Sequence, residues 1–233
     1  MSVPVSVIIP LAPGEDEWRP LVPTLKLPNG SEILLATGSA NFEMPELPLA
    51  AGVKINQVEE GKGRAGQMNA GAKLAQFDWL WFLHADSRLA DDTLTALEAC
   101  LADNEDGLFF FDLRFRDDGP KAMKSNEIAV RWRSDLLKMP FGDQGFLIKR
   151  VLFEELGGYR EDLPYGEDHV FAWKTRQDGY PVRRTGGSLF TSARKYKTGG
   201  WFKVTAKHVW LTVLQAAPQA LIYCRRRVRK MFS

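Results

Sequence analysis

The sequence predicts an α/β fold with a mostly parallel central sheet flanked by helices, followed by a helical extension. The first observation is that short apolar runs alternate with helical patterns, which is typical of βαβ units. The second is an abrupt change of charge: residues 1–182 carry 19 basic and 29 acidic side chains, whereas residues 183–233 carry 12 basic and no acidic ones. We therefore expect one α/β domain over residues 1–200 and a basic amphipathic extension over residues 201–233.

Composition excludes several other classes of protein. A chain of 233 residues with 45% hydrophobic content can bury a large core, which argues against disorder, collagen and coiled coil. The two cysteines, Cys100 and Cys224, are far apart and belong to no Cys/His cluster, so neither a disulfide framework nor a zinc site is expected. The first residues lack a basic, then apolar, leader pattern, and no stretch is clearly long and apolar enough to span a membrane. We expect a cytoplasmic protein.

The first ninety residues contain three short apolar runs that are typical of buried parallel strands. These runs are Val5–Ile9, Glu32–Ala36 and Trp79–His84. Helical patterns over Ala65–Ala75 and Asp91–Leu101 complete the alternation. Ligands of such sheets bind beyond the carboxyl ends of the strands, so the segments that follow them are expected to form the site.

The second half of the chain continues with less regular elements. Gly107–Phe115 and Gly145–Lys149 are predicted strands, and a compact loop over Pro140–Gln144 precedes the second of them. A predicted helix over Lys124–Lys138 has Ile128, Trp132 and Leu136 in line, and another begins at Gly166 and ends before Gly179.

Asp86 stands at the tip of a buried strand, in the segment His84-Ala-Asp86. A carboxylate in this position points into the crevice, where a divalent cation can bridge it to a diphosphate. The alternative is that Asp86 only caps the turn that follows.

A glycine-rich segment, Glu60–Ala72, places Lys62 and Arg64 just before a helix. Cationic side chains and free backbone N–H groups there are suited to phosphate, although neither standard nucleotide-binding loop pattern is present. A flexible start to the helix explains the same residues.

Two further acidic groups stand in the second half. Glu167 and Asp168 are adjacent at a helix start, where they either complement the helix dipole or supply a general base. Asp143, next to Gln144 in the Phe-Gly-Asp-Gln loop, either binds a substrate hydroxyl or stabilises the turn.

The order of these segments resembles the family-2 glycosyltransferases of the GT-A fold over roughly residues 3–200. The opening strand VSVIIP, ending at Pro10, is similar to the family's nucleotide-binding strand, and the stretch containing Asn69-Ala-Gly71 is similar to its sugar-nucleotide helix. His84-Ala-Asp86 stands where the family has its D-x-D metal motif, and Gly166-Glu-Asp168 where it has the catalytic base. The segments GRAGQMNAGA, FGDQG and TSARKY are most similar to a small bacterial subgroup labelled as associated with arsenosugar biosynthesis.

This resemblance implies an inverting transfer of a sugar from a UDP- or GDP-linked donor to an unidentified acceptor hydroxyl. Asp86 would hold Mg²⁺ or Mn²⁺ on the donor diphosphate, and Asp168, or less readily Glu167, would take the acceptor proton. The implied donor-binding residues are Pro10, Lys62, Arg64, Asn69, His84, Asp86 and Arg194. Asp143 and Gln144 are placed on the acceptor side.

The sequence departs from the family pattern in three places. His84 replaces the first acid of D-x-D, and we expect it to end the strand and to donate a hydrogen bond to a residue of the metal site rather than to bind the metal itself. Ala36-Thr-Gly-Ser39 has no carboxylate where many relatives have an Asp-rich turn, and the first strand continues as Leu-Ala-Pro-Gly-Glu15 instead of an Asn-Glu form. These changes imply altered base recognition or weak activity.

The C-terminal segment mixes basic residues with Trp and Phe, from Arg194-Lys-Tyr-Lys197 to Arg225–Lys230. Such a pattern is typical of an amphipathic helix on an anionic membrane surface. Packing of its apolar face on the body, with the arginines solvated, is the alternative. Nucleic-acid binding is not expected, because the body is acidic and no recognition motif is present.

Two other functions remain open at this point. A sugar-phosphate nucleotidyltransferase would show a G-x-G-x-R loop after the first strand, which Leu11-Ala-Pro-Gly14 does not supply. A non-catalytic membrane-surface binding protein on a degenerate transferase fold is compatible with the missing Asp-rich turn and with His84.

Overall fold

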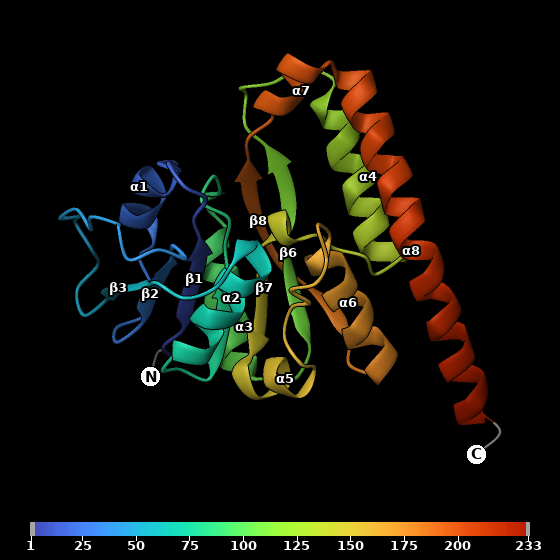
Figure 1. Cartoon of the computed structure of the whole chain (residues 1–233), viewed down its shortest axis with the longest axis horizontal. Coiled ribbons are helices and arrows are strands. Elements are labelled where there is room, and N and C mark those ends of the chain that lie inside the picture. Colours follow the sequence, from blue (N-terminus) through green and yellow to red (C-terminus); the bar gives the residue numbers. More distant parts are fainter. Residues whose placement is uncertain (1–2, 232–233) are drawn as a thin grey trace.

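The structure is a computed structural model that describes the backbone of residues 3–231 and the side chains of residues 3–226. Its centre is one eight-stranded sheet of order β3-β2-β1-β4-β7-β6-β8-β5 (Figure 1). Helices cover both faces of this sheet, and a long helix follows at the C-terminal end, so the predicted fold class is confirmed.

The first half of the sheet is parallel. It consists of β1 (Ser6–Pro10), β2 (Glu32–Ala36), β3 (Lys54–Val58) and β4 (Trp79–Phe82). The predicted runs give β1, β2 and β4, although β4 ends two residues before His84. The sequence did not indicate β3, because this edge strand is largely polar and its residues are mostly exposed or half-buried.

The second half of the sheet mixes directions. Strand β7 (Phe146–Lys149) runs antiparallel between β4 and β6 (Leu108–Phe115). Strand β8 (Val182–Thr191) pairs in parallel with β6, and the two-residue β5 (Arg88–Leu89) lies antiparallel at the edge. Strand β8 was not predicted, since it begins with a polar and glycine-rich segment.

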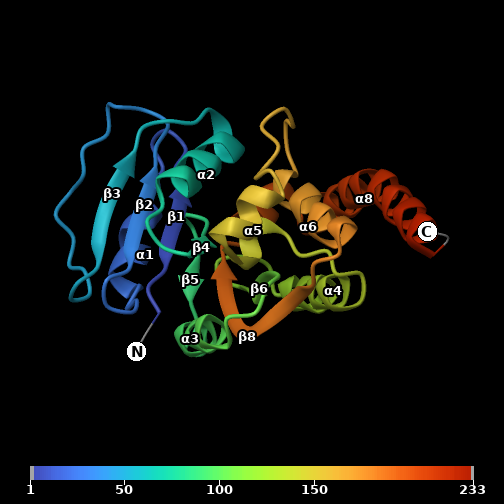
Figure 2. The ribbon, with the colours of Figure 1, turned by 90° about the horizontal axis from the view of Figure 1, so that it is seen from below.

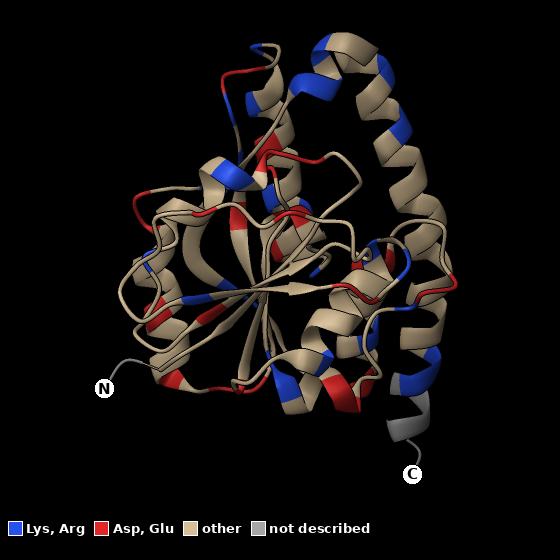
Figure 3. Ribbon diagram, turned by 60° about the vertical axis from the view of Figure 1, so that its left-hand side comes forward, with Lys and Arg blue, Asp and Glu red and all other residues tan. Residues whose placement is uncertain are grey.

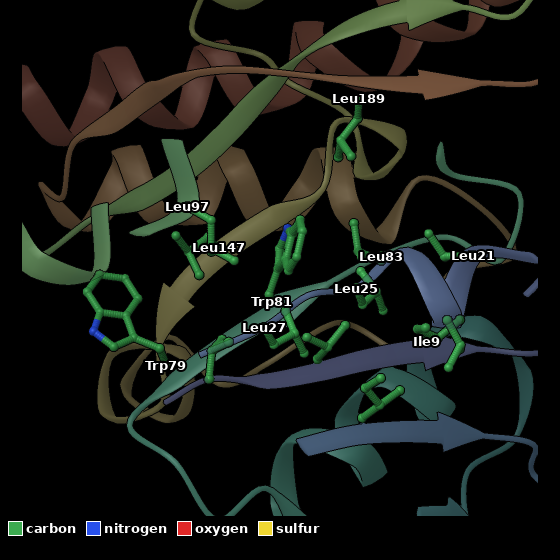
Figure 4. Close-up of a cluster of buried hydrophobic side chains, with 14 of the residues drawn as sticks. Ile9, Leu21, Leu25, Leu27, Trp79, Trp81, Leu83, Leu97, Leu147 and Leu189 are labelled. Carbon is green, nitrogen blue, oxygen red and sulfur yellow. The ribbon is translucent and has the colours of Figure 1, made fainter. Parts of the chain in front are cut away.

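Alternate residues of the strands point to opposite faces of the sheet and contribute to two separate hydrophobic cores. Ile9, Trp81 and Leu83 point to the face covered by α1 (Trp18–Leu21) and α3 (Thr93–Asp103), and Figure 4 shows part of this cluster. The next residues along the strands, such as Ile8 and Phe82, pack on the other face. That face is covered by α2 (Gly63–Leu74), α5 (Arg150–Glu155) and α6 (Glu167–Asp178). Burial on both faces explains why the strands appear in the sequence as continuous apolar runs.

Three helices form the C-terminal side of the molecule: α4 (Met123–Leu136), α7 (Arg194–Gly199) and α8 (Trp201–Met231). A small third core joins them to β6 through residues such as Phe115, Met123 and Tyr196. The line of apolar residues on α4 is not part of this core. Ile128, Trp132 and Leu136 are more than 60% exposed, because α4 packs through its opposite side.

Candidate active site

A cavity of about 690 Å³ opens at the carboxyl ends of β1, β2 and β4. This is the edge at which the strand pattern predicts ligand binding. Its lining comes from the ends of these strands, the start of α2 and their adjoining loops: Pro10, Ala12, Pro13, Glu15, Thr37, Gly38, Gly61, Lys62, Gly63, Arg64, Gln67, His84, Ala85 and Asp86.

The start of α2 is shaped by a close backbone approach. Gly61 has φ +98°, and a Cβ at this position would lie 2.4 Å from the carbonyl carbon of Gly66. Only glycine fits, and the resulting turn places Lys62 and Arg64 against the cavity. No side chain caps the helix start, so N–H groups of its first turn remain available to an anion.

Arg64 connects the cavity to the acidic start of α6. Its Nε donates to Glu167, and its Nη2 lies 3.7 Å from Asp168 Oδ2. Burial alone lowers the pKa of the Arg64 guanidinium, but Asp168 and Glu167 outweigh burial and raise it. Arg64 therefore stays charged, and it holds two acids at the edge of the cavity.

Asp168 is a buried carboxylate with several stabilising neighbours. Its Oδ2 accepts the Gly142 N–H at 2.6 Å, and its Oδ1 accepts the His169 N–H at 2.7 Å. Burial alone raises the pKa of Asp168, but the Arg64 charge and these two N–H donors outweigh it and hold the pKa below the ordinary value. Asp168 is therefore ionised at neutral pH and able to accept a proton.

A second glycine brings a loop against this carboxylate. Gly142 begins a short 3-10 helix, η2 (Gly142–Gln144), and a Cβ there would lie 2.7 Å from Asp168 Oδ2 and 3.0 Å from His84 Nε2. The backbone can donate to Asp168 only because no side chain intervenes. Burial, followed by the charge of Arg64, lowers the pKa of His84, so this imidazole is neutral beside the acids.

Asp86 lies in the cavity as a half-buried carboxylate. Its Oδ2 accepts a weak hydrogen bond from Thr191 Oγ1 at 3.3 Å, and no salt bridge involves it within residues 3–226. Across that range no group of three or more His, Cys, Asp or Glu side chains is arranged to hold a metal. A cation at Asp86 would thus need ligands from a bound substrate, which is how Mg²⁺ is commonly held at phosphate sites.

The Phe-Gly-Asp-Gln loop places its two polar residues differently. Asp143 Oδ1 is buried and has no hydrogen-bond partner among the described residues. Gln144, in contrast, uses its side chain within the protein: Nε2 donates to Phe111 O at 3.0 Å, and Oε1 accepts from Ser134 Oγ at 2.9 Å. The contacts of Gln144 fix the loop, whereas Asp143 Oδ1 stays unpaired within the described residues.

Two of the predicted donor-binding residues lie outside the cavity lining. Asn69 holds the loop after α5, because its Nδ2 donates to Tyr159 O at 2.8 Å and its Oδ1 accepts the Tyr159 N–H at 2.9 Å. Arg194 borders a neighbouring depression, where its Nη2 donates to Glu17 Oε1 at 2.6 Å. Such contacts between distant segments leave no local signal in the sequence.

The cavity is also lined by residues that the sequence did not indicate. Glu15, Thr37 and Gln67 all contribute to it, and Gln67 Nε2 donates to Leu11 O at 2.8 Å, which ties α2 to the end of β1. Glu15 and Thr37 stand in the segments that depart from the family pattern. Their position just after β1 and β2 was the signal that could have identified them.

Comparison with known proteins supports the fold. Residues 47–160 match the family model described as "Glycosyl transferase family 2". No curated protein matches the chain.

Solved structures give matches over most of the chain. One is S. aureus TarS 1-349 in complex with UDP-GlcNAc, with 15% identity, a TM-score of 0.59, and coverage of 82% of this chain and 58% of that one. Another is mannosyltransferase PcManGT from Pyrobaculum calidifontis in complex with GDP-Man and Mn²⁺, with 20% identity, a TM-score of 0.63, and coverage of 93% and 64%. The present chain thus spans about three fifths of the length of these proteins. It shares the fold of these GT-A glycosyltransferases, and the stretch that matches the Glycosyl transferase family 2 model, residues 47–160, is just under half of the chain.

Proposed function

We propose that the chain is an inverting glycosyltransferase that moves a sugar from a nucleotide-sugar donor to an acceptor hydroxyl. The observation that carries the proposal is that the cavity is lined by the carboxylate Asp86 and by Arg64, and that Arg64 lies 3.7 Å from the ionised carboxylate of Asp168. The family match and the solved neighbours with UDP-GlcNAc and GDP-Man support it.

The cavity has the groups that a nucleoside diphosphate needs. Lys62 and Arg64 supply positive charge and the start of α2 supplies backbone N–H donors. The nucleoside would extend along Pro10 and Thr37, where the chain has hydroxyl and backbone groups in place of an Asp-rich turn. Arg194 reaches the diphosphate only if it leaves Glu17, and Asn69 acts through the loop that it holds.

A divalent metal fits the residues present. Asp86 would hold Mg²⁺ or Mn²⁺, which when bound would neutralise the charge of the departing diphosphate. The lack of a complete ligand set among the described residues is compatible with this role, because substrate oxygens and water would supply the remaining ligands. His84, half-buried and neutral, stays close to Asp168 and Gly142 rather than serving as a second metal ligand.

Asp168 is the proposed general base. As the acceptor oxygen bonds to the anomeric carbon, the bond from that carbon to the diphosphate oxygen breaks on the opposite side, and the acceptor proton moves to Asp168. The backbone N–H groups of Gly142 and His169 hold the carboxylate in place during this step. We assign Asp143 to the acceptor side, and the support for this is that its Oδ1 lacks a hydrogen-bond partner within the described part of the chain.

Nucleotide-binding calorimetry tests this function without knowledge of the acceptor. UDP and GDP are titrated into the protein with and without Mn²⁺. One of the two nucleotides should bind, and Mn²⁺ should strengthen its binding. Absence of metal-dependent binding for both would refute the transferase assignment. Membership of the arsenosugar-associated subgroup stays a prediction, to be tested by the choice of acceptors.

A further inference from the structure

Helix α8 presents an apolar face to solvent. Within residues 3–226 fourteen large hydrophobic side chains are exposed, and half of them belong to this one helix. They are Phe202, Val209, Trp210, Val213, Leu214, Leu221 and Ile222. Figures 1 and 2 show that α8 lies at the margin of the molecule, and its C-terminal end extends past the body. An exposed apolar surface of this kind marks an interaction site.

Polar contacts on the inner side fix the rotation of α8 about its axis. Trp201 Nε1 donates to Asn126 Oδ1 at 2.9 Å at the start of the helix. Further along, Gln219 Oε1 accepts from Gln177 Nε2 at 2.9 Å. Arg226 pairs with Asp178 near the end. These contacts, together with Trp201 and Val204 in the third core, hold the helix on α4 and α6, and the seven exposed apolar side chains face outward.

The charge of α8 has a single sign. Its sequence contains seven Lys and Arg residues and no Asp or Glu. Lys203 and Lys207 are exposed and lie two turns and one turn, respectively, before Trp210 on the same side of the helix. Figure 3 shows basic but no acidic positions along the described part of α8. This combination of apolar and cationic groups complements a surface that offers hydrocarbon beneath negative charge.

We propose that the outward face of α8 binds the surface of an anionic lipid bilayer. Trp210 and Leu214 enter the boundary between headgroups and acyl chains, and Lys203 and Lys207 contact the anionic headgroups. The helix lies on the membrane and does not cross it, since no described helix is long and apolar enough to span one. This inference goes beyond the proposed function and does not depend on it.

A second copy of the chain is a poorer occupant of the same face. Two α8 helices packed face to face would bring together surfaces that are both cationic and contain no carboxylate. Like charges across an interface oppose association, whereas anionic lipids neutralise them.

Vesicle sedimentation of the full chain tests the proposal. The vesicles contain phosphatidylcholine alone or phosphatidylcholine mixed with phosphatidylglycerol. The unmodified protein should sediment with the mixed vesicles, and much less with the neutral ones. The double variant Trp210→Asp with Leu214→Asp should reduce the partition coefficient about tenfold or more, because it removes apolar contact and adds negative charge. Val151→Asp is the matched control, since Val151 is 69% exposed on the distant helix α5.

A double variant that reverses the charge of two lysines separates electrostatic binding to anionic lipid from nonspecific hydrophobic adsorption. Lys203→Glu with Lys207→Glu should weaken binding to mixed vesicles. Added salt should likewise weaken the binding of the unmodified protein to these vesicles. Lys26→Glu with Lys54→Glu makes the same charge change at exposed positions away from α8 and should have little effect. Circular dichroism shows whether each variant keeps its helix content.

A probe on the helix itself reports the contact directly. Cys224 is exposed on α8, whereas Cys100 is buried, so an environment-sensitive thiol label attaches at Cys224. Its emission should shift to the blue with mixed vesicles. The proposal is overturned if binding is unaffected by the α8 variants. It is equally overturned if sedimentation velocity without lipid shows a dimer that Trp210→Asp with Leu214→Asp dissociates.

Discussion

Arg64, from the start of α2, is ion-paired with Glu167 at the start of α6, although 103 residues separate them in the chain. The same guanidinium lies 3.7 Å from Asp168. One cationic side chain thus links the proposed donor cavity to the proposed base, so binding of a diphosphate at Arg64 would alter the field at Asp168. The first predictions separate the roles of these three groups.

Asp168→Asn should abolish transfer and leave donor binding nearly intact. Asparagine keeps one oxygen, which can accept from only one of the two N–H groups of Gly142 and His169, and it cannot take the acceptor proton, so kcat should fall by about 10²–10⁴-fold. Turnover with a donor and acceptor, together with calorimetry of UDP or GDP, measures the two effects.

Glu167→Gln is the matched control for that variant. It also removes a carboxylate next to Arg64, but we expect Glu167 to position the guanidinium rather than to accept the proton. Transfer by Glu167→Gln should therefore persist. If Asp168→Asn retained full turnover and Glu167→Gln lost it, the base would be Glu167.

Arg64→Gln should shift the acid limb of the kcat/KM profile to higher pH. In the native protein Arg64 helps to outweigh burial and hold the pKa of Asp168 below its ordinary value, so the base stays ionised into acidic solution. Without Arg64, burial raises that pKa, and protonation removes the base at a higher pH. Lys62→Gln is the control, because it removes a cavity cation that does not contribute to the pKa of Asp168. An unshifted limb for Arg64→Gln would show that another group titrates.

Asp86→Asn should weaken the metal dependence of nucleotide binding. The amide keeps the size of the side chain and loses its charge, so the strengthening of nucleotide binding by Mn²⁺ should fall about tenfold or more, which corresponds to about 1.4 kcal/mol. Calorimetry with and without Mn²⁺ measures it. Asp103→Asn, at an exposed position at the end of α3, should behave like the unmodified protein. Unchanged Mn²⁺ dependence in Asp86→Asn would remove Asp86 from the metal site.

The sequence predicts those parts of the fold in which local pattern and burial agree. Strands β1, β2 and β4 are buried on both faces and appear as apolar runs, and α6 has glycines at both ends. Strand β8 has no such signal. This strand is stabilised by contacts with residues far away in the sequence, such as the ion pair between Arg184 and Asp112 on β6.

The same limit applies to the candidate site. Strand ends predicted that Pro10, His84 and Asp86 would meet at one edge, because parallel strands place their carboxyl ends together. The resemblance places Arg194 near the diphosphate, whereas in the structure Arg194 pairs with Glu17, which is 177 residues away in the chain. No sequence pattern indicates this contact. The sequence pattern predicts that α8 is amphipathic, but only the packing of α8 on α4 and α6 shows which side faces outward.

Acid should destabilise the protein through His169. This imidazole is buried, its Nε2 accepts the Trp173 Nε1–H at 3.1 Å, and its Nδ1 has no hydrogen-bond partner within residues 3–226. Burial lowers the pKa of His169 to about 4 from an ordinary 6.5, so between these values the unfolded chain binds the proton more readily than the folded one. The stability contributed by neutral His169 is present above pH 6.5 and is lost as the pH falls through that window. From pH 7 to pH 5 this single group should cost about 2 kcal/mol.

His169→Gln isolates this contribution, because glutamine can still accept the Trp173 N–H but does not titrate. Urea unfolding at pH 7 and pH 5 gives the free energy of unfolding of both proteins. His84 and His208 also have lowered pKa values and remain in both, so the difference between the two pH dependences reports His169 alone. The variant should lose about 2 kcal/mol less than the unmodified protein on acidification. Equal losses would mean that His169 is already protonated or solvated in the folded state, which would contradict its burial against Phe141 and Trp173.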